Sequence, residues 1–169
     1  NNSSTWDCNC IPSLTDSVYV EPTHNVIIDA DAYVYDLYVE ATGTLEMGAD
    51  FNLNVSGDFV INGALDFTNG ELAMVGNETQ FINANGSTVN LNKVLIESSN
   101  TSNILFFNGT FVLNNTLTPN NGVMIIISGT NFIVNSTSAT TTGRIGVMAP
   151  SFTMQGNVTV KRILPSGIT

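Results

Sequence analysis

The feature that most constrains this chain is a pair of large apolar residues two positions apart, which recurs with glycine and asparagine between one pair and the next. The stretch SGDFVINGALDFTNGELAMVGNE, residues 56–78, contains Phe59 with Ile61, Leu65 with Phe67, and Leu72 with Met74. Side chains two apart lie on the same face of a strand. Each pair therefore predicts a very short strand with one buried face, followed by a sharp corner.

The pairs form an internal repeat. From Leu37 to Leu72 their first members are 8, 8, 6, 6 and 7 residues apart, which is too close for a crossover helix between successive strands. The remaining pairs are Leu37/Val39, Leu45/Met47, Leu53/Val55, Val89/Leu91, Val94/Ile96, Ile104/Phe106, Phe111/Leu113, Met124/Ile126, Phe132/Val134, Phe152/Met154 and Val158/Val160.

Two all-β architectures suit such short strands: an antiparallel β-sandwich, and a parallel β-solenoid (β-helix) in which three strands and their corners make one coil. Sandwich strands usually recur every 8 to 12 residues or about that, so the tighter spacing and the Gly and Asn corners favour the solenoid. Three units imply a coil of about 18 to 27 residues and about six or seven coils. In such a stack the 23 asparagines predict amide side chains that hydrogen-bond from coil to coil.

Charge is unevenly distributed along the chain. Residues 1–97 hold all 14 acidic residues and one base, Lys93, whereas residues 98–169 hold three bases and no acid. Nucleic acids and anionic membrane surfaces are bound by basic patches, so we expect neither as a partner. The longest apolar run, VMIII at residues 123–127, is too short to span a membrane, and we expect no membrane insertion.

The N-terminal stretch differs from the repeat. Residues 3–22 contain the only Trp and both Cys, and they predict a cap that covers the exposed end of a solenoid. Cys8 and Cys10 have no further cysteine or nearby histidine to complete a metal site. A disulfide between them is the alternative in an oxidising compartment, and an extended chain would strain it because the two side chains would diverge.

No catalytic motif is recognisable, and we expect no catalytic residue and no cofactor. His24 is the only histidine, and nothing in the sequence places a serine beside it for a Ser/His/Asp set. Asp29, Asp31 and Asp36 lie close enough in sequence to supply calcium ligands, but their spacing is not that of an EF-hand. A solvated acidic face is the alternative interpretation of these carboxylates.

A carbohydrate-active enzyme is the main alternative function, because several glycosidases and polysaccharide lyases are parallel β-helices. Such an enzyme needs paired carboxylates across a cleft. A cleft that holds two of Asp29, Asp31, Asp36, Glu40 and Glu46 would favour it. The acidic half of the chain has a single base and the other half has no acid, which is why we expect no catalysis.

Three segments carry a resemblance that covers most of the chain. They are LYVEATGTLEMGADFNLNVSGDFVINGALDF, VGNETQFINANGSTVNLNKVLIESS and NVTVKRILPSG. Together they resemble the large β-solenoid surface proteins that Bacteroidota export by type IX secretion, of the gliding-adhesin or surface-appendage type. The resemblance implies a spacer or adhesive stalk and brings no catalytic residues. It also implies O-glycosylation of Ser17, because Asp16-Ser17-Val18 is similar to the short acceptor signal of that phylum.

We therefore expect an N-terminal cap or linker at residues 1–16, a β-solenoid at 17–160, and the start of a following segment of a larger protein at 161–169. The expected function is that of a non-catalytic stalk, spacer or adhesin of a secreted glycoprotein on the bacterial cell surface. The expected partners are other domains of the same chain, copies of itself, and surface glycans or proteins. A self-assembling fibre subunit is a further alternative.

Overall fold

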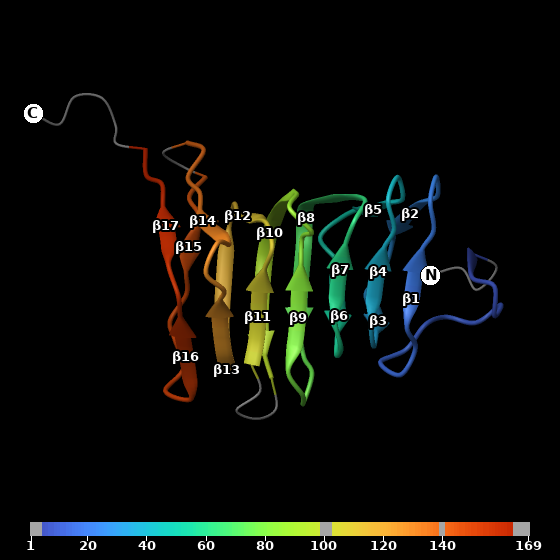
Figure 1. Cartoon of the computed structure of the whole chain (residues 1–169), viewed down its shortest axis with the longest axis horizontal. Coiled ribbons are helices and arrows are strands. Elements are labelled where there is room, and N and C mark those ends of the chain that lie inside the picture. Colours follow the sequence, from blue (N-terminus) through green and yellow to red (C-terminus); the bar gives the residue numbers. More distant parts are fainter. Residues whose placement is uncertain (1–4, 99–102, 139–140, 164–169) are drawn as a thin grey trace, which may run out of the picture.

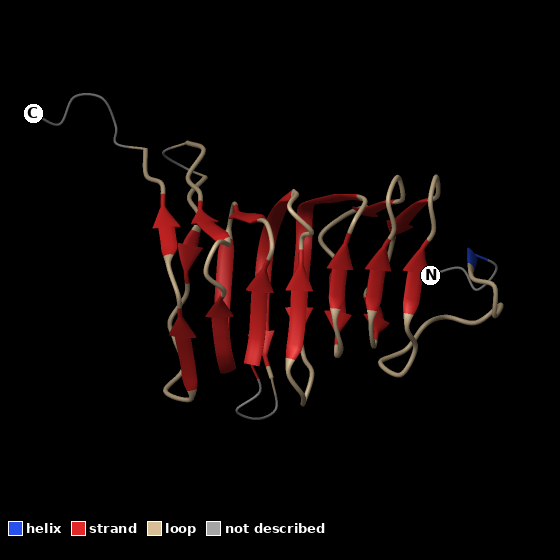
Figure 2. Ribbon diagram, viewed as in Figure 1, coloured by secondary structure: helices blue, strands red, loops and turns tan. Residues whose placement is uncertain are grey.

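The apolar pairs form short strands that stack in parallel from coil to coil, and the chain is a β-solenoid of about six turns (Figure 1). The computed structural model describes residues 5–98, 103–138 and 141–163. All pairings between its named strands are parallel, which confirms the solenoid and excludes the sandwich. Strands make up the three faces, and loops lie at the corners between them (Figure 2).

Each coil contributes one strand, or part of a longer one, to each of three faces. Face A contains β1 (Val18–Val20), β4 (Leu37–Val39), β7 (Phe59–Ile61), β9 (Gln80–Asn83), β11 (Asn103–Phe107), the second half of β13 (Thr116–Ile126) and β16 (Phe152–Gln155). Face B contains β2 (Asn25–Ile28), β5 (Thr44–Met47), the first halves of β8 (Ala64–Met74) and β10 (Thr88–Glu97), then β12 (Thr110–Leu113), β14 (Asn131–Val134) and β17 (Val158–Val160). Face C contains β3 (Ala32–Val34), β6 (Asn52–Val55), the second halves of β8 and β10, the first half of β13, and β15 (Arg144–Ile145).

The register gives the length of each coil. On face A, Val18 pairs with Leu37, 19 residues later, and Ile82 pairs with Phe106, 24 residues later. These lengths agree with the predicted coil. The last coil is longer, since Met124 pairs with Met154, 30 residues later. Its extra residues form a loop between β14 and β15, in which Ser136 and Thr142 make an antiparallel bridge.

The predicted corner after every pair is wrong in three places, because β8, β10 and β13 continue from one face to the next without interruption. In β8 the bend falls at Gly70, and in β13 it falls at Gly122, with φ of +66° and +106°. Glycine adopts this left-handed region at no steric cost. The strands thus change direction while their ladders with the neighbouring coils continue.

The core is a single column of apolar side chains that runs through the middle of the solenoid. Phe59, Phe106 and Phe111 are fully buried, as the period-two pattern predicts. Leu65 is only half-buried, and Val160 is 51% exposed. The prediction of a buried pair is wrong at Val160 because it belongs to the last coil, where no described coil packs beyond it.

Amide side chains connect successive coils at the corners, as predicted. The Asn85 Nδ2 donates to Asn62 Oδ1 at 2.8 Å, and Asn108 Nδ2 donates to Asn85 Oδ1 at 3.3 Å. Asn85 and Asn108 both have positive φ, 46° and 55°, a conformation that asparagine tolerates better than most residues. At the neighbouring Gly63, a side chain would collide with the backbone oxygens of Glu40 and Gly43.

One buried polar residue fastens a turn to the preceding coil. Gln80 is fully buried; its Oε1 accepts from Gly76 N at 3.0 Å, and its Nε2 donates to Val55 O at 3.1 Å and Gly57 O at 2.6 Å. Buried amides are tolerated only when they are paired in this way. The side chain replaces backbone partners that the turn itself does not supply.

Within the described part of the chain, no helix has the length and apolar character needed to cross a membrane.

Candidate functional site

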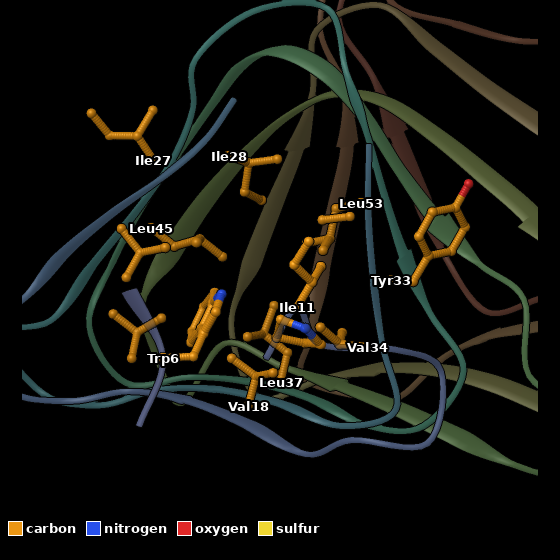
Figure 3. A pocket seen from close by; sticks show the side chains of 14 residues that line it. Trp6, Ile11, Val18, Ile27, Ile28, Tyr33, Val34, Leu37, Leu45 and Leu53 are labelled. Carbon is orange, nitrogen blue, oxygen red and sulfur yellow. The ribbon is translucent and has the colours of Figure 1, made fainter. Parts of the chain in front are cut away.

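The N-terminal cap, residues 5–16, covers the open end of the first coil. Trp6 packs against the hydrophobic core, and its ring lies among Val18, Leu37 and Leu45 (Figure 3). The cavity between the cap and the core has a volume of about 60 Å³, well below the roughly 300 Å³ of a small-molecule site. The cap therefore closes the core and leaves no ligand-sized pocket inside it.

A larger groove, which we call the N-terminal groove, lies between the cap and the edge formed by β1 and the start of β2. Its volume of about 500 Å³ is within the range of ligand sites. Its polar and ionisable lining consists of Thr5, Asp7, Asp16, Ser17, Tyr19, Glu21, His24 and Asn25. With three carboxylates and no Lys or Arg in its lining, the groove is negatively charged at neutral pH and suits a cationic partner.

Asp16 holds the cap in place and stays ionised. Its Oδ2 accepts from the Ser13 hydroxyl at 2.6 Å and from the Ser13 backbone N–H at 2.9 Å. These hydrogen bonds to the charged form lower the pKa of the Asp16 carboxyl below its usual value. Asp16 therefore adds permanent negative charge to the groove.

The cap contains a disulfide between Cys8 and Cys10. Asn9 between them has a φ of +50°, so this segment is a turn and not the extended chain for which we expected strain. The two Cα atoms are 5.1 Å apart, within the ordinary range for a disulfide. Both cysteines also line the N-terminal groove.

His24 and Ser17 line the same groove, which the sequence did not predict. The Ser17 hydroxyl donates to Asp36 Oδ2 at 3.1 Å, so its proton is directed to a carboxylate and not to the imidazole. A Ser/His/Asp set needs the imidazole between the serine and the carboxylate. The two residues are neighbours in the groove without that order.

The predicted calcium and enzyme carboxylates mostly serve to hold coils together. Asp31 Oδ1 accepts from the backbone N–H of Asn52 at 2.9 Å, and Asp36 Oδ1 accepts from that of Asp58 at 2.8 Å. Glu46 Oε1 accepts from Asn25 Nδ2 at 3.2 Å. Neither the core cavity nor the N-terminal groove is lined by Asp29, Asp31, Asp36, Glu40 or Glu46.

No group of three or more His, Cys, Asp or Glu side chains among the described residues is arranged to hold a metal ion. Calcium binding by Asp29, Asp31 and Asp36 stays a prediction.

Sequence reasoning missed a carboxylate next to Asp36. Asp58 Oδ1 accepts from Phe81 N at 2.9 Å, so Asp36 and Asp58 repeat the same contact in successive coils. Burial raises the pKa of the Asp58 carboxyl, and the charge of Asp36 adds to the shift. Burial and then Asp36 also raise the pKa of Tyr38, whose ring stacks on Tyr19 with centroids 4.7 Å apart. The recurrence of Asp before an apolar pair was the available sequence signal.

The only base of the acidic half lies among carboxylates on the opposite side of the coil. Lys93 Nζ forms an ion pair with Asp50 Oδ1 at 2.8 Å, and this contact lowers the pKa of the Asp50 carboxyl. Glu71 pairs with Lys93 in the face C ladder. Burial raises the pKa of the Glu71 carboxyl, while the nearby Lys93 charge opposes the shift. The arrangement neutralises neighbouring acids along the stack.

Comparison with protein-family models gives no match for this chain, and comparisons with curated proteins and with solved structures give none either.

Proposed function

We propose that the chain is a non-catalytic structural module of a secreted bacterial cell-surface protein, in which the solenoid acts as a stalk or spacer. The observation that carries this proposal is the uninterrupted parallel stack of face A from β1 to β16. Each coil is joined to the next by backbone hydrogen bonds and by a shared core. Such a stack is a stiff rod whose length depends on the number of coils.

The use of the carboxylates supports a structural role over a catalytic one. Asp31, Asp36 and Asp58 accept backbone N–H groups of the following coil, so their lone pairs serve the stack. A glycosidase needs two carboxylates that face a bound sugar. The groove that does contain carboxylates lies at the end of the rod and not along it.

The extracellular location is supported by the Cys8–Cys10 disulfide, because disulfides persist in oxidising compartments. Ser17 is exposed at a corner of the first coil, where a glycan would meet no steric obstacle. We therefore propose O-glycosylation at Ser17, with export by type IX secretion as the resemblance implies. Intact mass of the natively produced protein should exceed that of the Ser17→Ala variant by one glycan, and equal masses after correction for the lost oxygen would contradict it.

The spacer function can be tested by changing the rod by one whole coil. Leu37 pairs with Phe59, so deletion of residues 37–58 places Phe59 where Leu37 was and preserves the register. The shortened rod should fold and lose one strand spacing, about 4.8 Å. Deletion of residues 37–47 is the matched control, which breaks the register and should unfold the chain.

In the cell that makes this protein, the one-coil deletion should reduce the reach of the surface protein without abolishing its display or secretion. Duplication of residues 37–58 should extend that reach. Release of sugar products from a polysaccharide by the purified full-length protein, with loss of this activity in an Asp36→Asn variant, would overturn the structural proposal in favour of an enzyme.

A further inference from the structure

The exposed large apolar side chains of the described residues gather at the two ends of the rod. At the N-terminal end these are Ile11, Leu14, Tyr19, Ile27, Tyr33 and Tyr35, and at the C-terminal end Val147, Met148, Val160 and Ile163. Between the ends only Phe81 and Ile127 are exposed to a similar degree. Apolar surface concentrated in this way marks interaction sites.

The two ends have opposite charge. Asp7, Asp16 and Glu21 line the N-terminal groove. The C-terminal end carries Lys161 and Arg162, and no acidic residue follows Glu97 in the chain. Opposite patches of this kind steer two surfaces together and select their orientation.

Each end also presents strand edges of matching direction. Among the described strands, β1 and β2 pair only with β4 and β5, and β16 and β17 pair only with β13 and β14. An open edge is a template for a further strand. Since all pairings are parallel, a second copy translated along the axis presents its strands in the direction that these edges require.

The cap decides where such a contact can form. Trp6 closes the end of the core, so a second copy is excluded from stacking directly over it. The groove beside the cap leaves the β1 and β2 edge accessible and offers the apolar surfaces of Pro12 and Val26 next to its carboxylates. The exposed segment from Val160 to Ile163 alternates apolar and basic residues in a way that suits this lining.

We propose that copies of this chain associate head to tail, with the basic C-terminal end of one copy docked in the acidic N-terminal groove of the next. Lys161 of one copy lies against Glu21 of its neighbour, and Val160 and Ile163 cover the apolar side of the groove. Such a heterologous contact does not close on itself, so it produces open chains. The proposal rests on the structural role proposed above and deepens it, because the contact would lengthen the rod.

The test is analytical ultracentrifugation of the 169-residue chain over a range of concentrations, at low salt and at about 0.5 M salt. The unmodified chain should form a concentration-dependent ladder of species that weakens with salt. Glu21→Lys and Lys161→Glu should each weaken association by at least about tenfold, because each places like charges together. An equimolar mixture of the two variants should restore association, since each reversed end then meets its complement. Glu78→Lys, an exposed acid in the middle of the rod, is the matched control and should change nothing.

A chain that stays monomeric at every concentration and salt would overturn the head-to-tail contact. So would association that responds equally to Glu78→Lys, or a mixture that fails to recover. Because the salt series uses the unmodified chain, it decides the question even if a variant fails to fold. A monomeric rod would leave the spacer function standing, whereas sugar release by the protein would remove that function and leave the association result unchanged.

Discussion

The middle coils and the last coil carry the same sequence repeat but differ in what the repeat achieves. In the middle coils Phe106 and Phe111 are fully buried, with their rings edge to face at 5.1 Å. In the last coil Val158 is half-buried and Val160 is 51% exposed. The difference shows that a solenoid pair is buried by the coils on both sides of it and not by its own coil alone. Stability should therefore be concentrated in the middle of the rod.

The largest expected effect comes from a core substitution in the middle coils. Phe106 contacts both Phe111 and Phe132 through edge-to-face rings 5.1 Å apart, so Phe106→Ala should lower the free energy of unfolding by about 3–5 kcal/mol. Val160→Ala in the last coil should change it by less than about 0.5 kcal/mol. Urea denaturation of both variants measures the contrast. Equal losses would mean that the last coil is buried after all.

The next effect concerns the buried amide. Gln80→Ala leaves Gly76 N, Val55 O and Gly57 O without their side-chain partner, and should cost about 2–3 kcal/mol because these groups are buried. Gln155→Ala, at an exposed position of the last coil, is the matched control and should be neutral within about 0.5 kcal/mol. A neutral Gln80→Ala in thermal and urea unfolding would show that water replaces the amide without loss.

A smaller effect is expected at the amide ladder. Asn85→Ala removes hydrogen bonds to Asn62 and Asn108 and places alanine at a φ of +46°, which should cost about 1–2 kcal/mol. Asn85→Gly keeps the backbone free to adopt this φ and should cost less. If both variants lose the same stability, the ladder and not the backbone conformation carries the effect.

The smallest effect is a pH dependence of opposite sign in the middle and at the N-terminal end. Burial raises the folded-state pKa of Asp58, so this carboxyl contributes stability below its unfolded pKa and loses it as pH rises through the folded value. The pKa of Asp16 is lowered by Ser13, so its contribution is present above the unfolded pKa and is lost as pH falls. Relative to the unmodified chain, Asp58→Asn should be least stable at acidic pH, and Asp16→Asn at neutral pH. Thermal midpoints measured from about pH 3 to pH 7 would contradict this if both differences had the same sign.

Much of the fold was predictable because the repeat states it many times over. The period-two pairs gave the strands, their close spacing excluded helices between them, and the Asn excess predicted the ladder that Asn62, Asn85 and Asn108 form. The continuous bends in β8 and β13 were not predictable, since a glycine such as Gly70 marks either an interruption or a bend that keeps the ladder. Only the neighbouring coils decide between the two.

The candidate site was much less predictable than the fold. Trp6 and the cysteines indicated a cap, but the groove forms between the cap and β1, and such a gap between two segments has no sequence signal. Ser17 and His24 line the same groove although they belong to different corners of the coil. Asp58 was passed over because sequence distance grouped Asp36 with Asp29 and Asp31, whereas the register places Asp58 directly above Asp36.

The most direct test of the structural account is a cryo-EM reconstruction of the native assembly from which this chain comes, at a resolution that shows side chains. The account predicts an elongated solenoid that continues into neighbouring domains or copies, with the acidic N-terminal groove occupied and the carboxylates of Asp36 and Asp58 engaged within the stack. A compact monomer in which these carboxylates face an open groove that binds sugar would contradict it.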